Sequence, residues 1–276
     1  MRRALSLFFV LAATAAYAHP PVGIVVDRGG NVYYSDLKQV WRVSPDGRKS
    51  VVVPNVHTHE LYLDAAGNLY GEHLWYEGEA INKWDYYVWR RSPDGRVQTV
   101  YGPKREFRTD YSFVRDAAGN QYWADREHHA IMKNKTVLAR GKFRDIRWMT
   151  ATPNGTVYLI DAVDLVQVAP NGAIRTVARN LSASRLIRPD IGEHHLLMGL
   201  WMDPHGNVCV ADFAHGEVKR VEVAGSGQRA AGRVTVIATS HLPWSVVGGT
   251  YAPNGDLWLL EWSVSNEARV RRAAGK

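Results

Sequence analysis

The chain has 276 residues, with 34 Lys and Arg against 27 Asp and Glu, and a formal net charge of +7. This excess is small and no Lys/Arg run exceeds three residues, so the charge favours solubility and argues against a nucleic-acid-binding surface. Cys209 is the single cysteine, which excludes an intramolecular disulfide, and the fold must therefore be stabilised by burial of a large, aromatic-rich core.

The first eighteen residues carry two arginines, then an apolar stretch, then Ala-Tyr-Ala before His19. This order predicts a secretory signal peptide at 1–18, because the apolar stretch is too short to span a bilayer comfortably. The alternative is a retained anchor or an N-terminal β-strand. Cleavage of 18 of the 276 residues leaves 258 residues, 19–276, with a net charge of +5. We expect an exported, periplasmic or extracellular protein with no nucleic-acid partner and no stable membrane insertion after cleavage.

Six similar turns follow along the rest of the chain. They read DRGGN, DAAGN, DAAGN, TPNGT, DPHGN and APNGD, and they begin at Asp27, Asp64, Asp116, Thr152, Asp203 and Ala252. Each turn lies between two short apolar runs, a pattern typical of a tight β-hairpin. A third run, a second turn and a fourth run follow in most units, as in VWRVSPDGRKSVVV at 40–53. Four short strands per repeat are the signature of propeller blades.

The sequence therefore predicts an all-β fold, a single six-bladed β-propeller domain at 19–276 with four-stranded blades. The sixth repeat offers only three runs before the chain stops at Lys276. We accordingly expect a three-stranded last blade. The alternative is that the N-terminal segment is retained and supplies the missing strand.

The recurring pattern, an apolar run, D-x-x-G-N and then V-Y-x-x-D, resembles NHL-repeat propellers and, more loosely, the gluconolactonase and senescence-marker-protein group. The resemblance spans roughly residues 20–275 and implies the fold more than the chemistry, because many functions share this scaffold. In lactonase-like relatives, metal ligands precede the turn Asp by five residues. The corresponding residues here are Val22, His59, Tyr111, Arg147, Met198 and Val247. Only His59 suits a metal, so the resemblance does not extend to a calcium cage or to gluconolactonase activity.

Histidines gather on one predicted face of the propeller. We call the face of the blade-to-blade connections the upper face and the face of the D-x-x-G-N turns the lower face. Nine of the eleven histidines belong to upper-face segments: His57, His59, His73, His128, His129, His194, His195, His215 and His241. Two long upper segments, 73–86 and 179–197, belong to blades 2 and 5, which are opposite in a six-membered ring. We expect them to meet over the axial mouth, where propellers bind ligands.

A zinc site is one hypothesis for these histidines, because amidating lyases of the broader NHL-like group hold zinc with axial histidines and three imidazoles suit catalytic zinc. The candidate metal ligands are His57, His59 and His195, with His194 as the alternative to His195. Glu60 is the candidate base on a metal-bound water. No cofactor is fixed by the sequence, although zinc is favoured over calcium if a divalent metal binds. The alternative is a set of ordinary hydrogen-bonded loop histidines.

The predicted second strands end in a ring of polar residues: Asp36, His73, Asp125, Asp161, Asp212 and Glu261. Asp in this position commonly accepts backbone N–H bonds from the following turn, which is a structural role. His73 and Glu261 depart from the Asp pattern and are therefore candidate catalytic residues for proton transfer.

Further candidates concern ligand binding. Arg144 and Arg147 are predicted to bind an anionic group, Trp75 to stack on a ring, and His194 and His195 to line the mouth. Surface ion pairs and blade packing are the alternatives. Two functions remain open. The first, which we favour, is an exported NHL-type propeller that binds a small molecule, peptide or protein at its upper axial face. The second is a metal-dependent hydrolase or lyase with a His/Glu site at the channel mouth.

Overall fold

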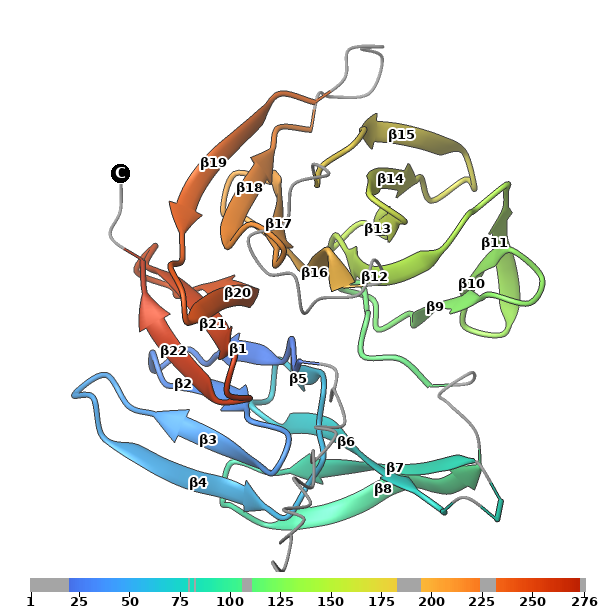
Figure 1. Ribbon diagram of the computed structural model, residues 1–276. Coiled ribbons are helices and arrows are strands. Elements are labelled where there is room, and N and C mark those ends of the chain that lie inside the picture. Colours follow the sequence, from blue (N-terminus) through green and yellow to red (C-terminus); the bar gives the residue numbers. More distant parts are fainter. Residues whose placement is uncertain are drawn as a thin grey trace, which may run out of the picture.

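Six antiparallel sheets surround a common axis in the computed structural model (Figure 1). The structure describes residues 20–78, 80–81, 83–105, 111–182, 195–223 and 232–273. No α-helix is found in these ranges, and no helix among them is long and apolar enough to cross a membrane. The protein is a six-bladed β-propeller, as the repeated turns predict.

The first three blades follow one another along the chain. Blade 1 comprises β1 (Ile24–Val26), β2 (Val32–Ser35), β3 (Gln39–Val43) and β4 (Lys49–Pro54). Blade 2 comprises β5 (Leu61–Leu63), β6 (Leu69–Tyr76), β7 (Trp84–Arg91) and β8 (Val97–Arg105). Blade 3 comprises β9 (Tyr122–Asp125), β10 (Ala130–Lys133) and β11 (Thr136–Arg140).

The last three blades complete the ring. Blade 4 comprises β12 (Ile146–Ala151), β13 (Val157–Asp161), β14 (Asp164–Val168) and β15 (Ile174–Ala178). Blade 5 comprises β16 (Leu197–Met202), β17 (Val208–Asp212), β18 (Glu217–Val221) and β19 (Val234–Thr239). Blade 6 comprises β20 (Trp244–Tyr251), β21 (Leu257–Ser263) and β22 (Ala268–Arg272). In blades 1, 2, 4, 5 and 6 the first strand lies innermost, next to the axis (Figure 1).

Blades 3 and 6 differ from the four-stranded pattern. In blade 6, β20, β21 and β22 form a three-stranded sheet, which confirms the expected short blade. In blade 3, the predicted first strand is reduced to one bridge between Arg115 and Gln121. The Ser112 hydroxyl accepts the Val114 N–H at 3.0 Å, a local bond that competes with a regular strand ladder.

The segment 73–86 is mainly strand rather than the predicted insertion loop. β6 continues to Tyr76 and β7 begins at Trp84, and these two residues face each other at the end of the ladder. Blade 2 therefore carries a longer central hairpin than blade 1, 3, 4 or 5. Of the opposed segment 179–197, residues 183–194 lie outside the described residues.

The lower turns share a hydrogen-bonded arrangement that fixes the hairpins. In blade 3, the Asp116 carboxylate accepts bonds from the Asn120 N–H, the Asn120 side-chain amide and the Tyr122 hydroxyl, each at 2.8–2.9 Å. Blades 1 and 2 repeat these bonds through Asp27, Asn31, Tyr33 and through Asp64, Asn68, Tyr70. Gly119 has φ = 80°, which a residue with a side chain rarely adopts, so the turn requires glycine there.

Apolar clusters fill the spaces between neighbouring blades. The largest one joins blades 5, 6 and 1, with Met198, Leu259 and Tyr34 among its most buried members. Smaller clusters join blades 4 and 5, 3 and 4, 1 and 2, and 2 and 3. Stability therefore comes from packing between sheets, as the single, buried Cys209 requires.

Candidate functional site

A cavity of about 270 Å³ lies on the axis, where the innermost segments of all six blades meet. Its lining is mostly apolar and glycine-rich, with Glu60 and Arg115 as its two charged residues. Other lining residues are Val22, Gly23, Ile24, Leu61, Tyr62, Phe113, Val114, Trp148, Met149, Thr150, Ala151, Gly199, Leu200, Trp201, Gly248, Gly249 and Thr250. An apolar hollow with a few polar groups is the usual form of a small-molecule site.

Glu60 is fixed at the cavity by backbone bonds on both sides. The His59 carbonyl accepts the N–H groups of Val22 at 2.9 Å and Gly23 at 2.7 Å, which ties blade 2 to blade 1. The Glu72 carboxylate accepts the N–H groups of His59 at 2.6 Å and Glu60 at 3.2 Å. Glu72 is fully buried and its role is therefore to position this segment. The predicted catalytic residue Glu60 does reach the axial cavity.

Charged side chains from blades 2, 3 and 4 interact electrostatically near the end of the cavity at which Glu60 lies. Although Arg126 is exposed, partial desolvation lowers its pKa and the Arg147 guanidinium lowers it further, whereas Asp145 and Glu60 raise it. Arg126 follows β9 of blade 3, and Asp145 and Arg147 belong to the start of β12 in blade 4. We define the upper mouth by four residues, Glu60, Arg126, Asp145 and Arg147. It thus carries two carboxylates and two guanidinium groups.

The predicted anion-binding arginines have carboxylate partners within their own blade. Arg144 donates to the Asp161 carbonyl at 2.9 Å and to Asp164 at 2.8 Å. Arg147 donates to Asp145 at 2.7 Å. Both contacts fit the surface ion pairs that the sequence left open as an alternative. Arg147 belongs to the upper mouth, whereas Arg144 contacts Asp161 at the end of β13 and Asp164 at the start of β14.

Asp161 positions the segment that leads into the first strand of blade 4, as Glu72 positions the segment that leads into the first strand of blade 2. Its carboxylate accepts the N–H groups of Arg144 and Asp145, both at 2.7 Å. The structural role expected for the second-strand Asp residues is present, but in this blade the donors precede the first strand instead of following the second. In blade 2 the same role falls to Glu72, one residue before the expected position at His73.

Three predicted residues, His57, His59 and His73, come together on blade 2. The His57 and His59 rings are 4.8 Å apart between centroids, and the His57 N–H donates to the Nδ1 of His73 at 3.0 Å. This bond leaves the His73 proton on Nε2, and burial lowers the pKa of His73 against the opposing effect of Glu72. His73 is therefore held as a neutral imidazole.

The described residues contain no group of three or more His, Cys, Asp or Glu side chains able to hold a metal. His195 is half-buried just before β16, and His194 lies outside the described residues. The set His57, His59 and His195 therefore stays a prediction, without a described ligand cluster to support it.

The extended hairpin of blade 2 carries a series of aromatic rings on the upper side. Trp75 lies 5.7 Å from the His73 ring and 6.0 Å from the Tyr87 ring between centroids, and its indole N–H donates to Glu77. Tyr76 and Trp84, 5.4 Å apart, are more than one-third exposed. The predicted stacking residue Trp75 thus belongs to an aromatic surface on the extended hairpin of blade 2.

Glu261, the other predicted proton-transfer residue, is enclosed by donors. Its carboxylate accepts bonds from Ser240 at 2.6 Å, Arg269 at 2.7 Å and Arg271 at 2.6 Å. Burial alone would raise the pKa of Glu261, but these three bonds outweigh burial and keep it below its usual range. The contacts of Glu261 and those of His73 lie on different blades, so the described contacts do not bring the two residues together.

A D-x-x-H spacing after the second strand, which was not singled out from the sequence, forms side-chain pairs in blades 3 and 5. The His128 Nδ1 lies 2.9 Å from Asp125 at an exposed position. The His215 Nδ1 lies 3.0 Å from the buried Asp212, whose carboxylate also accepts the Lys219 ammonium. The repeated spacing in VCVADFAH and QYWADREH is the signal that could have identified these pairs.

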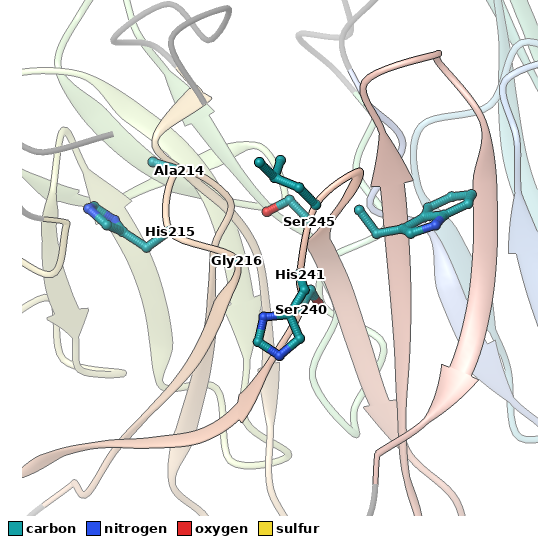
Figure 2. Close-up of a pocket in the computed structure, with 8 residues that line it drawn as sticks. Ala214, His215, Gly216, Ser240, His241 and Ser245 are labelled. Atoms are coloured by element: carbon teal, nitrogen blue, oxygen red, sulfur yellow. The ribbon is translucent and has the colours of Figure 1, made fainter. Parts of the chain in front are cut away.

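A second hollow, of about 380 Å³, lies between blades 5 and 6 (Figure 2). Figure 2 shows the His215 ring turned away from His241 and Ser245. The hydroxyls of Ser240 and Ser245 are used by Glu261 and by the Phe213 carbonyl. Not every polar group of this hollow is bonded, because within the described residues the Nε2 of His215 is buried without a partner. We regard the axial cavity as the candidate site because all six blades contribute to its lining, whereas this hollow is lined by segments of blades 5 and 6.

Comparison with known proteins agrees with the fold. No protein-family model and no curated protein sequence matches the chain. A glucose dehydrogenase-like oxidoreductase from Thermus thermophilus is similar in structure, with a TM-score of 0.63, 13% identity, and coverage of 93% of this chain and 97% of that one. A streptogramin B lyase is similar with a TM-score of 0.57 and 9% identity, and the match covers 91% of this chain and 93% of that one. The calcium-binding protein regucalcin from Agrobacterium tumefaciens is similar with a TM-score of 0.52 and 14% identity, and the match covers 87% of this chain and 81% of that one.

These similarities confirm the predicted resemblance to gluconolactonase-like six-bladed propellers at the level of the fold. At 9–14% identity they show the architecture alone. The class of the molecule is therefore a six-bladed β-propeller with an axial cavity.

Proposed function

We propose that this protein is exported and binds a small organic molecule in the axial cavity, with entry at the upper mouth. The observation that carries the proposal is the cavity itself, to which every blade contributes lining residues. The inner segments of the six blades could pack around the axis without leaving a hollow. A cavity that all six blades line, with two charged residues in its lining, therefore favours a ligand site. The upper mouth and the aromatic surface of blade 2 supply further contacts for recognition.

The test is a binding screen on the full chain with a matched blocked variant. Small acids, amines, sugars and neutral aromatic compounds are screened by the NMR shifts of the ten tryptophan indole N–H signals. Leu200→Trp places a larger side chain at the cavity wall and should abolish binding. Val264→Trp, at a position that is 52% exposed, is the control and should bind normally. Hits that bind Leu200→Trp unchanged would contradict the proposal, and cooperative urea unfolding verifies that both variants are folded.

Catalysis is the second candidate, and one contact favours it. The Nδ1 of His59 lies 3.6 Å from the buried Glu72 carboxylate, and the adjacent Glu60 lines the cavity. An imidazole close to a carboxylate beside a ligand site is a combination that general bases use, although at 3.6 Å the two groups are not hydrogen-bonded here. A metal-dependent hydrolase or lyase remains the specific form of this hypothesis.

Metal content and two variants test the catalytic candidate. Zinc at about one equivalent per chain after dialysis, lost in His59→Ala, would support a metal-assisted reaction. His195→Ala serves as the companion variant, since the sequence predicts both residues as ligands. Protein without stoichiometric zinc whose ligand affinity is unchanged in both variants would favour binding alone. Export is tested separately, because N-terminal sequencing of the exported protein should begin at His19.

A further inference from the structure

Two residues that line the axial cavity, Arg115 and Trp201, each carry a buried N–H donor without an acceptor among the described residues. The Nε of Arg115 and the Nε1 of Trp201 are buried from solvent, and within the described ranges neither has a hydrogen-bond partner. A buried donor without an acceptor has lost its hydrogen bonds to water without a replacement, so such groups are uncommon and need a physical reason.

Arg115 also carries a charge that no described carboxylate balances. One of its terminal nitrogens donates to the Tyr111 hydroxyl at 3.0 Å, and its guanidinium lies over the rings of Tyr62 and Tyr111 at 5.4 and 5.5 Å. In the part of the chain that is described, Arg115 makes no ion pair. Its neighbour Asp116 is occupied by the bonds of the lower turn. The rings orient the guanidinium without neutralising it.

Trp201 is held rigidly at the same cavity. Its side chain is 7% exposed, and a Cβ on Gly249 would lie 2.5 Å from its ring. The glycine therefore allows the indole to pack closely against β20. Because the ring is fixed by this contact, its N–H direction is fixed as well.

The two charged residues of the cavity lie at different levels along the axis. Arg115 immediately precedes the lower turn at Asp116, whereas Glu60 precedes its turn at Asp64 by four residues. At about 3.3 Å per residue, the two levels differ by at most about 10 Å. Of the two charged lining residues, Glu60 thus lies toward the upper mouth and Arg115 toward the lower end.

We infer that the lower end of the axial cavity binds a carboxylate group, held by Arg115 and the Trp201 indole N–H, with the apolar remainder of the ligand against the cavity wall. Arginine and tryptophan side chains only donate hydrogen bonds, so their partner must be an acceptor. A carboxylate satisfies both donors and also balances the guanidinium charge. Ile24, Phe113 and Met149 provide the apolar wall. This inference rests on the proposed function and specifies its ligand class.

The test compares benzoate with its neutral analogue benzamide. Both are titrated into the full chain at constant ionic strength, and the indole signal of Trp201, assigned with Trp201→Phe, is followed together with the Arg115 Nε–H signal. We expect benzoate to shift both signals saturably and benzamide to bind at least about tenfold more weakly.

Variants and matched controls complete the experiment. Arg115→Gln should weaken benzoate binding by about tenfold or more, and Arg115→Lys by less, because lysine keeps the charge but not the planar donor geometry. Arg42→Gln is the control, since the Nε of Arg42 is also buried without a partner but lies outside the cavity lining. It should bind benzoate normally, as should Trp258→Phe.

The outcomes separate this inference from the proposed function. Equal binding of benzamide and benzoate at Trp201, insensitive to Arg115→Gln, would overturn the carboxylate inference while leaving a ligand-binding cavity. A benzoate response equally reduced by Arg42→Gln would show a general charge effect and would overturn it as well. Absence of any benzoate response at Trp201 and Arg115 overturns the inference even if the wider screen finds neutral ligands in the cavity.

Discussion

The lower turns of blades 1, 2 and 3 share one arrangement, whereas the upper ends of the same blades do not. In each of these lower turns, an Asp carboxylate accepts hydrogen bonds from an Asn side chain and a Tyr hydroxyl. At the upper ends, blade 1 uses the Ser35 hydroxyl, blade 2 the Glu72 carboxylate and blade 3 the Asp125–His128 pair. The repeated arrangement builds the blade, and the divergent one varies how each connection approaches the axis.

The comparison teaches that an acidic residue on the upper face is not by itself a site residue. Glu72, Asp161 and Glu261 are all buried, and each is used for positioning. Glu60, in contrast, lines the cavity. Variants of the two groups should therefore separate stability from binding.

Glu261→Ala should have the largest effect and gives the strictest test of this distinction. Removing the buried carboxylate takes an acceptor from Arg269 and from Arg271, which keeps its bond to the Thr239 carbonyl, and breaking such a pair costs about 3 kcal/mol. Urea unfolding should report this loss of stability, with ligand binding by the folded fraction unchanged. The control is the exposed Glu267→Ala, which should unfold like the wild type. A stable Glu261→Ala protein that loses binding would reassign Glu261 to the site.

Asp116→Ala should have an intermediate effect and tests the lower turn. The variant loses acceptors for two N–H groups and the Tyr122 hydroxyl, which should cost about 2 kcal/mol. Asp116→Asn, which keeps one acceptor oxygen, should cost less. Both losses are measured by urea unfolding, and loss of ligand affinity without loss of stability would break the assignment of the lower turns to structure.

The pH dependence of stability should show two separate windows. The pKa of His73 lies below its ordinary 6.5, so the unfolded chain takes up a proton first and stability falls as the pH drops below 6.5. The pKa of Glu261 lies below its ordinary 4.5, so its contribution is present above 4.5 and is lost as the pH falls through the folded-state pKa. Urea midpoints across pH measure both windows. His73→Gln should flatten the first and Glu261→Gln the second, and unchanged slopes would contradict this account.

The smallest effects should distinguish the two D-x-x-H pairs. His128→Ala, at an exposed position, should leave thermal stability unchanged within error. His215→Ala removes a contact of the buried Asp212 and should cost about 1 kcal/mol, since Lys219 and Ser182 still satisfy that carboxylate. Equal effects of the two variants would show that the pairs do not differ in burial as described.

Local turn chemistry made the fold predictable from the sequence. Asp or Thr followed by Gly at a fixed spacing determines the lower hairpins of blades 1 to 5 through bonds between residues up to six positions apart, as between Asp64 and Asn68. The three-stranded last blade was also predictable, because the number of apolar runs can be counted. The short first strand of blade 3 was not, since it depends on a local Ser112 bond that competes with the ladder.

The site was predicted only in part, because inner strands do not alternate regularly. Register shifts interrupt β12, β16 and β20 between Ile146 and Met149, Leu197 and Leu200, and Val246 and Gly248. Counting residues from the turn therefore does not decide which side chains face the axis. Glu60 and Arg147 were identified by their position on the upper face. Arg115, Arg126 and Trp201 were missed because their positions near the axis depend on the assembled ring and not on a local sequence pattern.

The short last blade has a consequence for how damage would spread through the ring. Blade 6 and blade 1 meet through packing within a single apolar cluster that contains both Ala273 and Ile24. Trimming the chain back to β21 would therefore uncover side chains at the opposite end of the sequence. A protease acting on the last strand should expose new cleavage points around β1 and β2, while blades 3 and 4, on the other side of the circle, stay resistant for longer.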